Sequence, residues 1–266
     1  MTTTKKAEAA SNKENSHVNL FIEADEQVKD LIHATIEVRD QENRLAKGFS
    51  PIHEKLMHLA VVSNNLQHFD HVHPTFAGEG RFEADIKLPF GGEYTFFSGY
   101  QREGMSQELS VSRQFIEGET LSNYSIDTTL RHQTVEETEV SLRVYCAERN
   151  PTEGDSDGSK NIARADEKTT IRFSLKQKDS DMPVQDLQEY LGAIGHLIIV
   201  KQPDNEASAL SRDDYMHVHS NFENADGQID FTVNFPEAGK YKMWGEFKRN
   251  NRSIVPSFGI EVAESY

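Results

Sequence analysis

The sequence predicts an all-β protein made of two tandem antiparallel β-sandwiches. Three observations support this fold class: short segments in which apolar and polar residues alternate, Pro and Gly turn signals between those segments, and a repeat of the same elements in both halves of the chain. The chain has 266 residues, a length that suits two domains, each large enough to bury its own core.

The internal repeat is clearest around one strand and the turn that follows it. The segment GRFEADIKLPFGGEY (80–94) aligns without gaps with GQIDFTVNFPEAGKY (227–241). The same upstream elements precede both copies in the same order, namely HLAVV at 58–62 with HLIIV at 196–200 and H-V-H at 71–73 with H-V-H at 217–219. We therefore infer a tandem duplication of one module.

The predicted strands follow one order in both copies. In the repeated segment Phe82, Ala84, Ile86 and Leu88 alternate with charged residues, a pattern typical of a half-buried strand. The P-x-x-G that follows ends the strand, because Pro cannot donate to a ladder and Gly permits a tight turn. A returning strand then begins at Tyr94 or Tyr241. The earlier strands are predicted at VNLFIEA (18–24), ATIEV (34–38), EVSLRVY (139–145) and TIRFSL (170–175).

Roughly seven short strands in about a hundred residues, without a helical period, indicate a β-sandwich. The predicted organisation is a disordered polar tail (1–17), a first sandwich (18–118), a connector (119–134) and a second sandwich (135–266) with an acidic loop near 147–165. Part of that loop resembles a calcium-binding loop. However, Arg164 stands where the bidentate Glu is required, so we favour a solvated acidic loop.

The charge balance argues against several classes of partner. With 44 Asp and Glu against 28 Lys and Arg, the net charge is −16, and without a basic stripe neither nucleic acid nor an anionic membrane is an expected partner. No apolar run approaches the roughly 20 residues of a transmembrane segment. The single cysteine, Cys146, excludes an internal disulfide and is expected to be buried.

The N-terminal residues contain no apolar segment of the kind found in secretory signal peptides. The sequence as written therefore predicts a cytoplasmic protein. If a signal peptide has been removed, a cell-envelope location is expected instead.

Histidines carry the main chemical signal. In a strand, residues i and i+2 point to one face about 7 Å apart, so each H-V-H presents two imidazoles side by side, and an adjacent strand can add a third. Three imidazoles suit Cu²⁺ or Zn²⁺. Six of the eleven histidines occupy matching places in the two copies and are the predicted metal ligands: His58, His71 and His73, and His196, His217 and His219.

Each predicted site would keep one coordination position for a further ligand. Nearby candidates are Met57, His68 and Asp70 in the first copy and Met216 and Asp214 in the second. The alternative remains open that the matched histidines are structural and donate to backbone carbonyls. The unmatched His17, His33, His53 and His132 are predicted to be surface or strand-edge side chains.

The sequence predicts that the protein is not an enzyme. Neither G-x-S-x-G nor H-E-x-x-H is present. The closest catalytic alternative is a two-domain cupin, with His217, His219 and Glu223 at the required spacing, whereas Glu79 lies too far from the first H-V-H. The leading Gly of that motif is absent, because Asn65 and Ser211 hold its place, and no His follows P-x-G.

The repeated H-L-x-x-V, H-x-H and P-x-x-G-x-Y elements resemble the YtkA/FixH-like immunoglobulin-type β-sandwich modules of bacteria. The resemblance covers most of 18–117 and 135–263. It implies an immunoglobulin-like fold and a binding role, often in the cell envelope and sometimes beside copper or other heavy-metal functions. One departure is Ser220, which stands where the first copy has Pro74.

Three hypotheses follow. The leading one is a non-enzymatic copper- or zinc-binding protein that sequesters, delivers or senses the metal, with a possible protein partner in metal handling. The second is a structural or protein-interaction module. The third is a cupin-type metalloenzyme. In the second hypothesis aromatic side chains form the contact surface: Tyr94, Phe97 and Tyr100 in the first copy, and Tyr241, Trp244 and Phe247 in the second.

Overall fold

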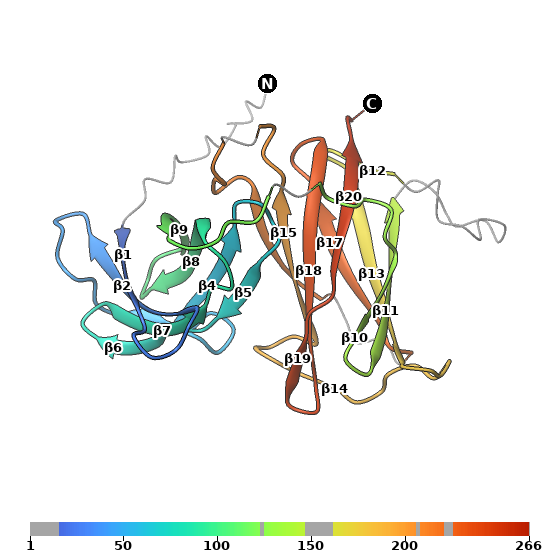
Figure 1. The fold of residues 1–266 in the computed structure, drawn as a ribbon, viewed down its shortest axis with the longest axis horizontal. Helices are drawn as coiled ribbons and strands as arrows, with labels where there is room; N and C mark the ends of the chain where they lie inside the picture. The colour runs from blue at the N-terminus through green and yellow to red at the C-terminus, as the bar shows by residue number, and fades with distance from the viewer. Residues whose placement is uncertain (1–15, 123–124, 147–161, 206–207, 221–225, 266) are drawn as a thin grey trace, which may run out of the picture.

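The computed structural model shows two β-sandwiches lying side by side (Figure 1). It describes residues 16–122, 125–146, 162–205, 208–220 and 226–265, in which every regular element is a strand. Among these residues we find no helix with the length and apolar character that a membrane crossing needs. The all-β class and the duplication predicted from the sequence are confirmed.

The first sandwich has the strand arrangement of an immunoglobulin fold. Its outer sheet has the order β1-β2-β7-β6, and its inner sheet has the order β3-β8-β4-β5 with β9 also paired to β8. This is the ABED and GFC grouping of immunoglobulin domains, with one further strand beside C. The bounds are β1 Ser16–Ala24, β2 Leu31–Asp40, β3 Phe49–Ser50, β4 Met57–Ser63, β5 Phe69–Val72, β6 Thr75–Gly78, β7 Arg81–Lys87, β8 Gly92–Arg102 and β9 Gln107–Ile116.

The second sandwich repeats most of this arrangement, with β11, β13 and β17 in the places of β1, β2 and β7, but its fourth outer strand, β10, pairs with β11, whereas β6 pairs with β7. Its outer sheet has the order β10-β11-β13-β17 and its inner sheet the order β12-β20-β18-β15-β16, with β14 and β19 also paired to β18. The one parallel pair among the named strands of the described residues is β12 with β20. The bounds are β10 His132–Val135, β11 Thr138–Cys146, β12 Ala163–Arg164, β13 Lys168–Gln177, β14 Leu187–Gln188, β15 Gly195–Lys201, β16 Tyr215–His219, β17 Gln228–Asn234, β18 Gly239–Arg249, β19 Arg252–Ile254 and β20 Ser257–Ala263.

The repeated P-x-x-G-x-Y motif forms the same corner in both sandwiches. The hydroxyl of Tyr94 donates a hydrogen bond to the carbonyl of Phe90 at 2.9 Å, and that of Tyr241 donates to the carbonyl of Glu237 at 2.8 Å. This is the tyrosine corner of immunoglobulin-like sandwiches. The motif glycines, Gly92 and Gly239, have φ of 126° and 141°, which side chains with a Cβ rarely adopt.

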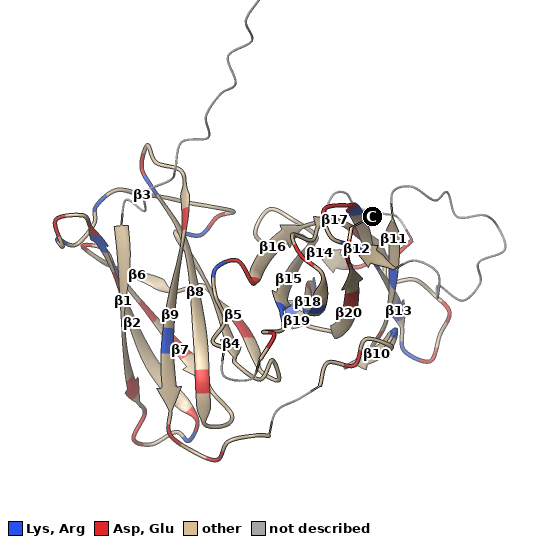
Figure 2. Cartoon of the chain, turned by 90° about the horizontal axis from the view of Figure 1, so that it is seen from above, with Lys and Arg blue, Asp and Glu red and all other residues tan. Residues whose placement is uncertain are grey.

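Strand β4 is buried on both faces, and this determines how the sandwiches pack. Because successive side chains alternate across a strand, Leu59 and Val61 enter the core of the first sandwich, whereas Ala60 and Val62 enter a separate apolar cluster. Strand β15 supplies that same cluster with Ile198 and Val200. The inner sheets of the two sandwiches therefore pack against each other through an apolar layer, and β4 and β5 lie on the side facing β15 and β16 (Figure 2).

This interface is reciprocal. Phe69 stacks on Trp244 with ring centroids 4.9 Å apart, and Phe97 stacks on Tyr215 at 4.4 Å. In the alignment of the copies Phe69 corresponds to Tyr215 and Phe97 to Trp244, so each sandwich presents the same patch to the other, as in a two-fold dimer. Ile126, within the predicted connector, is buried in the same cluster.

Candidate metal centre

The six matched histidines lie at one end of this interface, on the faces that also carry the apolar contact residues. In each triad the possible ligand atoms lie within 4.8 Å of one another. In the second sandwich His196 on β15 pairs directly with His219 on β16. The members of the first triad come from β4, from β5 and from the residue just beyond β5: His58, His71 and His73.

The two triads also meet each other. The ring centroids of His71 and His217 are 5.2 Å apart, and those of His58 and His217 are 5.9 Å apart. The sequence predicts one site in each sandwich and gives no indication of this meeting. The meeting follows from the packing, because His58 shares a strand face with Ala60 and Val62, which contact the other sandwich.

A repeated turn orients the first histidine of each triad. The Nε2 of His58 lies 2.8 Å from the carbonyl oxygen of Ile52, and the Nε2 of His196 lies 2.8 Å from that of Tyr190. Since a carbonyl oxygen only accepts, Nε2 carries the proton in both rings and Nδ1 keeps its lone pair. Those Nδ1 atoms lie 3.4 Å from the Nε2 of His71 and 3.2 Å from the Nε2 of His217.

Glu246 makes the surroundings of the two triads unequal. Its Oε2 lies 2.8 Å from the Nδ1 of His71, and the two side chains are 6% and 1% exposed. A carboxylate on β18 of the second sandwich therefore orients a ring of the first, as carboxylates commonly do for metal-binding histidines. The corresponding residue in the first sandwich is Gly99, because Gly99 pairs with His58 as Glu246 pairs with His196.

The third histidine of each triad has an unpartnered nitrogen. The Nε2 atoms of His73 and His219 are buried without a hydrogen-bond partner in the described part of the chain, and such a group costs about 1–3 kcal/mol. Burial lowers the pKa of His58 to about 4 and that of His219 to about 3, and neighbouring imidazoles add to both shifts. At pH 7 these rings are neutral, which is the form that binds metals.

The additional ligands suggested by the sequence do not lie at the centre. Met57 belongs to the first core, and Met216 packs against the second. Asp214 accepts hydrogen bonds from the backbone and hydroxyl of Ser211, both at 2.7 Å.

The other two candidates of the first copy also lie away from the centre. His68 contacts the rings of Phe90 and Tyr94. Asp70 is next to His71 on β5 and therefore points to the opposite face of the strand. Glu223 of the cupin alternative lies outside the described residues.

Among the unmatched histidines, one lies beside the centre. His53 is exposed, as predicted, but its ring centroid is 3.9 Å from that of His219 in the other sandwich. Its place in the turn before β4 is the one signal that could have pointed to it, since that turn also holds the carbonyl that orients His58. His17, His33 and His132 are exposed as predicted, whereas Cys146 is half-buried rather than buried.

The aromatic side chains proposed as a contact surface divide into two groups. Tyr94 and Tyr100 lie in the first core, and Tyr241 and Phe247 in the second. Phe97 and Trp244 lie in the apolar layer between the sandwiches. Their contact partner is thus the other half of the same chain.

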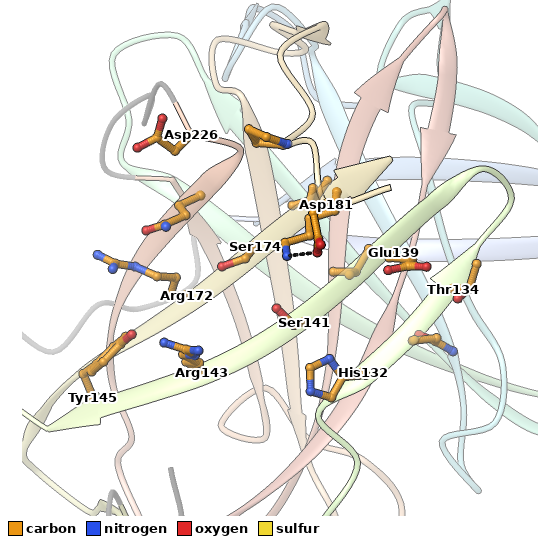
Figure 3. Close-up of a pocket in the computed structure, with 16 residues that line it drawn as sticks. His132, Thr134, Glu139, Ser141, Arg143, Tyr145, Arg172, Ser174, Asp181 and Asp226 are labelled. Atoms are coloured by element: carbon orange, nitrogen blue, oxygen red, sulfur yellow. Dashed lines mark hydrogen bonds and ion pairs between the residues drawn. The ribbon is translucent and has the colours of Figure 1, made fainter. Parts of the chain in front are cut away.

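A cavity lies on the outer sheet of the second sandwich. It has a volume of about 630 Å³ and is lined by polar side chains of β10, β11 and β13 (Figure 3). Arg172 makes a bidentate pair with Asp230 at 2.6 and 2.7 Å, and Lys176 contacts Asp181 at 3.0 Å. Because these charges are paired with each other, we place the candidate functional site at the histidines.

Similarity to solved structures is weak. A tetra-tandem repeat from the extending region of a large adhesion protein is 8% identical, with a TM-score of 0.30, and the match covers 93% of this chain and 49% of that one. Yersinia pseudotuberculosis InvD is 12% identical, with a TM-score of 0.24, over 94% of this chain and 58% of that one. The chain thus spans about half the length of these proteins, and scores this low support no functional argument. No curated protein matches the chain.

A protein family matches most of the chain in two segments, residues 7–114 and 156–264. The two segments contain the two histidine triads and the two tyrosine corners, one of each per segment. This supports the tandem duplication, while the resemblance to YtkA/FixH-like modules stays a prediction. The chain belongs to the family described as "Domain of unknown function (DUF8832)".

Proposed function

We propose that this protein binds a transition-metal ion, copper or zinc, in each of the two histidine triads. Two observations carry the proposal. In each triad one ring nitrogen of every histidine lies within 4.8 Å of the others, and the buried Nε2 atoms of His73 and His219 have no hydrogen-bond partner among the described residues. A cation bound in each triad would satisfy the Nε2 atom of that triad, because the nitrogen would donate its lone pair to the metal.

The spacing of the nitrogens supports this assignment. Ligands on a tetrahedral zinc ion with Zn–N bonds of about 2.0–2.1 Å lie about 3.3 Å apart. The corresponding separations are 3.4 Å between His58 Nδ1 and His71 Nε2, and 3.2 Å between His196 Nδ1 and His217 Nε2. The other nitrogen of each ring, Nε2 of His58 and Nδ1 of His71, faces an oxygen acceptor. This leaves Nδ1 of His58 and Nε2 of His71 as the atoms that would bind the ion.

The proposed role is metal binding for sequestration, delivery or sensing rather than catalysis. The donor set supports copper or zinc, because neutral imidazole suits both ions whereas Ca²⁺ and Mg²⁺ prefer oxygen ligands. The absence of hydrolase sequence motifs and the resemblance to YtkA/FixH-like modules support a binding role.

The test is calorimetric titration with Zn²⁺ and Cu²⁺ of the full chain and of a variant with His71, His73, His217 and His219 all replaced by Ala. We expect about two ions per chain with a Kd below about 10 μM, equivalent to about −7 kcal/mol, and loss of both in the variant. The matched control replaces the exposed His17, His33 and His132 and should bind like the original protein. Weaker binding, or binding retained in the quadruple variant, would overturn the proposal.

A further inference from the structure

The space beside the two triads differs. A cavity of about 310 Å³ has two histidines of the second triad in its lining, His217 and His219, and one of the first, His58. Gly99, Gln107 and Leu109 of the first sandwich and Tyr215 of the second also line it. This volume is at the lower end of those that hold small molecules. Gly99 is open to it, because a Cβ built there would meet no atom closer than 3.8 Å.

Larger side chains occupy the corresponding positions beside the first triad. Glu246, the counterpart of Gly99, contacts the Nδ1 of His71 at 2.8 Å. Tyr190, the counterpart of Ile52, places its hydroxyl 3.3 Å from the Nδ1 of His73. Both residues reach across the interface, so side chains of the second sandwich contact His71 and His73, and His58 is the member of the first triad that lines the cavity.

The charged groups next to the two triads also differ. The cavity beside the second triad has no carboxylate among its described lining residues. A divalent ion held there by three neutral imidazoles carries no charge from its ligands to offset its own, and such an ion attracts an anionic ligand. The carboxylate of Glu246 acts electrostatically on His196 of the second triad, but its direct contact is with His71 of the first.

We propose that the second triad is an open metal site, whose ion takes a small anion as its fourth ligand from this cavity, whereas the first triad is a closed site covered by Glu246 and Tyr190. The inference rests on the proposed metal-binding function. It parallels the general distinction between closed metal sites and three-histidine sites that leave one position for an outside ligand.

Azide is the probe for the test, because it is a small anion and its bond to Cu²⁺ gives a charge-transfer absorption band. The full chain loaded with Cu²⁺ should bind one azide per chain, and sodium chloride at equal ionic strength serves as the salt control. A variant with His217→Ala and His219→Ala should lose the azide band. The matched variant with His71→Ala and His73→Ala should keep it.

Filling the cavity gives the sharper test. Gly99→Leu adds an apolar side chain and Gly99→Glu restores the carboxylate found in the other half. Both variants should bind copper in unchanged stoichiometry but bind azide at least tenfold more weakly. Circular dichroism checks that each variant is folded.

The outcomes separate the two proposals. If the protein binds no copper, both fail. If copper binds but the ions take two azides or none, or if Gly99→Leu leaves azide affinity unchanged, the proposed function stands and the open second site is wrong.

Discussion

The two sandwiches carry the same three histidines on corresponding strands, yet the residues around those histidines differ. The interface contacts are matched in kind, with one aromatic stack on each side, Phe69 on Trp244 and Tyr215 on Phe97. At the candidate metal centre the matched positions differ: the second sandwich has Glu246 and Tyr190 where the first has Gly99 and Ile52. The aromatic contact residues are thus similar in both halves within the apolar layer, because close packing requires each patch to fit the matching patch of the other sandwich.

The divergence is possible because the centre lies at the end of that layer. The first sandwich has Gly99 and a cavity at the position where the second has the carboxylate of Glu246, and the apolar cluster between the sandwiches is kept. The comparison teaches that a duplicated module can keep its histidines and still give the two triads different surroundings, by changing the residues next to them.

The largest expected effect tests the matched part of the comparison. Trp244→Ala and Phe97→Ala each remove a buried ring from the interface, 5% and 1% exposed respectively, and each should destabilise the protein by about 3–5 kcal/mol. Urea unfolding measures both. Phe115→Ala is the control, because this ring is 70% exposed and its removal should cost less than about 0.5 kcal/mol. A clearly smaller loss for one of the two rings would show that the interface is not reciprocal.

The next effect tests the difference between the triads. Glu246→Gln should weaken Zn²⁺ binding at the first triad by about 10–100-fold, or about 1.4–2.7 kcal/mol, because it removes the carboxylate that orients His71. Calorimetry in a background of His217→Ala and His219→Ala isolates this site. Ser253→Ala is the control, since its hydroxyl lies 3.5 Å from the other oxygen of Glu246. Unchanged affinity in the Gln variant would contradict a positioning role.

A smaller effect tests the tyrosine corners. Tyr94→Phe and Tyr241→Phe each remove one hydroxyl that donates to a carbonyl, at 2.9 and 2.8 Å. Each should cost about 0.5–1.5 kcal/mol of unfolding free energy, and metal affinity should not change. Thermal or urea unfolding gives the comparison. If only one substitution destabilises the protein, the two corners do not serve the two sandwiches equally.

The smallest effect concerns pH and the outer sheets. Hydrogen bonds that His33 donates to the carboxylates of Asp85 and Asp25 raise the pKa of this exposed histidine above its ordinary 6.5. This pairing therefore stabilises the first sandwich below the ordinary pKa and is lost as pH rises through the raised value. The outer sheet of the second sandwich instead pairs Arg172 with Asp230, and this contact raises the pKa of Arg172 above its ordinary value. An NMR titration should place the His33 pKa above 6.5 and lower it in Asp85→Asn; a value at or below the ordinary one would contradict the pairing.

Much of the fold followed from local sequence patterns. The strands and corners were predicted from period-two alternation, the P-x-x-G-x-Y motif and the repeat. The geometry of these short-range features is set by strand pleat and turn conformation, so the sequence alone is enough to predict them. The grouping of His71 with His73 follows from the same pleat. The addition of His58 required only that β4 and β5 be neighbours.

Other features depended on which surfaces meet. The contact of His53 with the matched histidines was not predicted, because its neighbour, His219, is 166 positions away in the chain and belongs to the other sandwich. The role of Glu246 could not be predicted from the sequence, because it is one acidic residue in a largely buried strand and its partner, His71, is far away in the chain. The aromatic rings Phe97 and Trp244 could not be assigned to core or interface from alternation alone, because strands of the inner sheets are buried on both faces.

The sequence by itself thus determined the β-sandwich class, the duplication and the six candidate ligands, because each rests on spacing along one strand or turn. Only the tertiary structure decided that the two triads form one centre, that Glu246 contacts His71 and that a cavity opens at His217 and His219. Those features arise where Ala60, Val62, Ile198 and Val200 bury a second strand face. Non-directional burial brings such faces together, and the strand pattern does not specify which face is the partner.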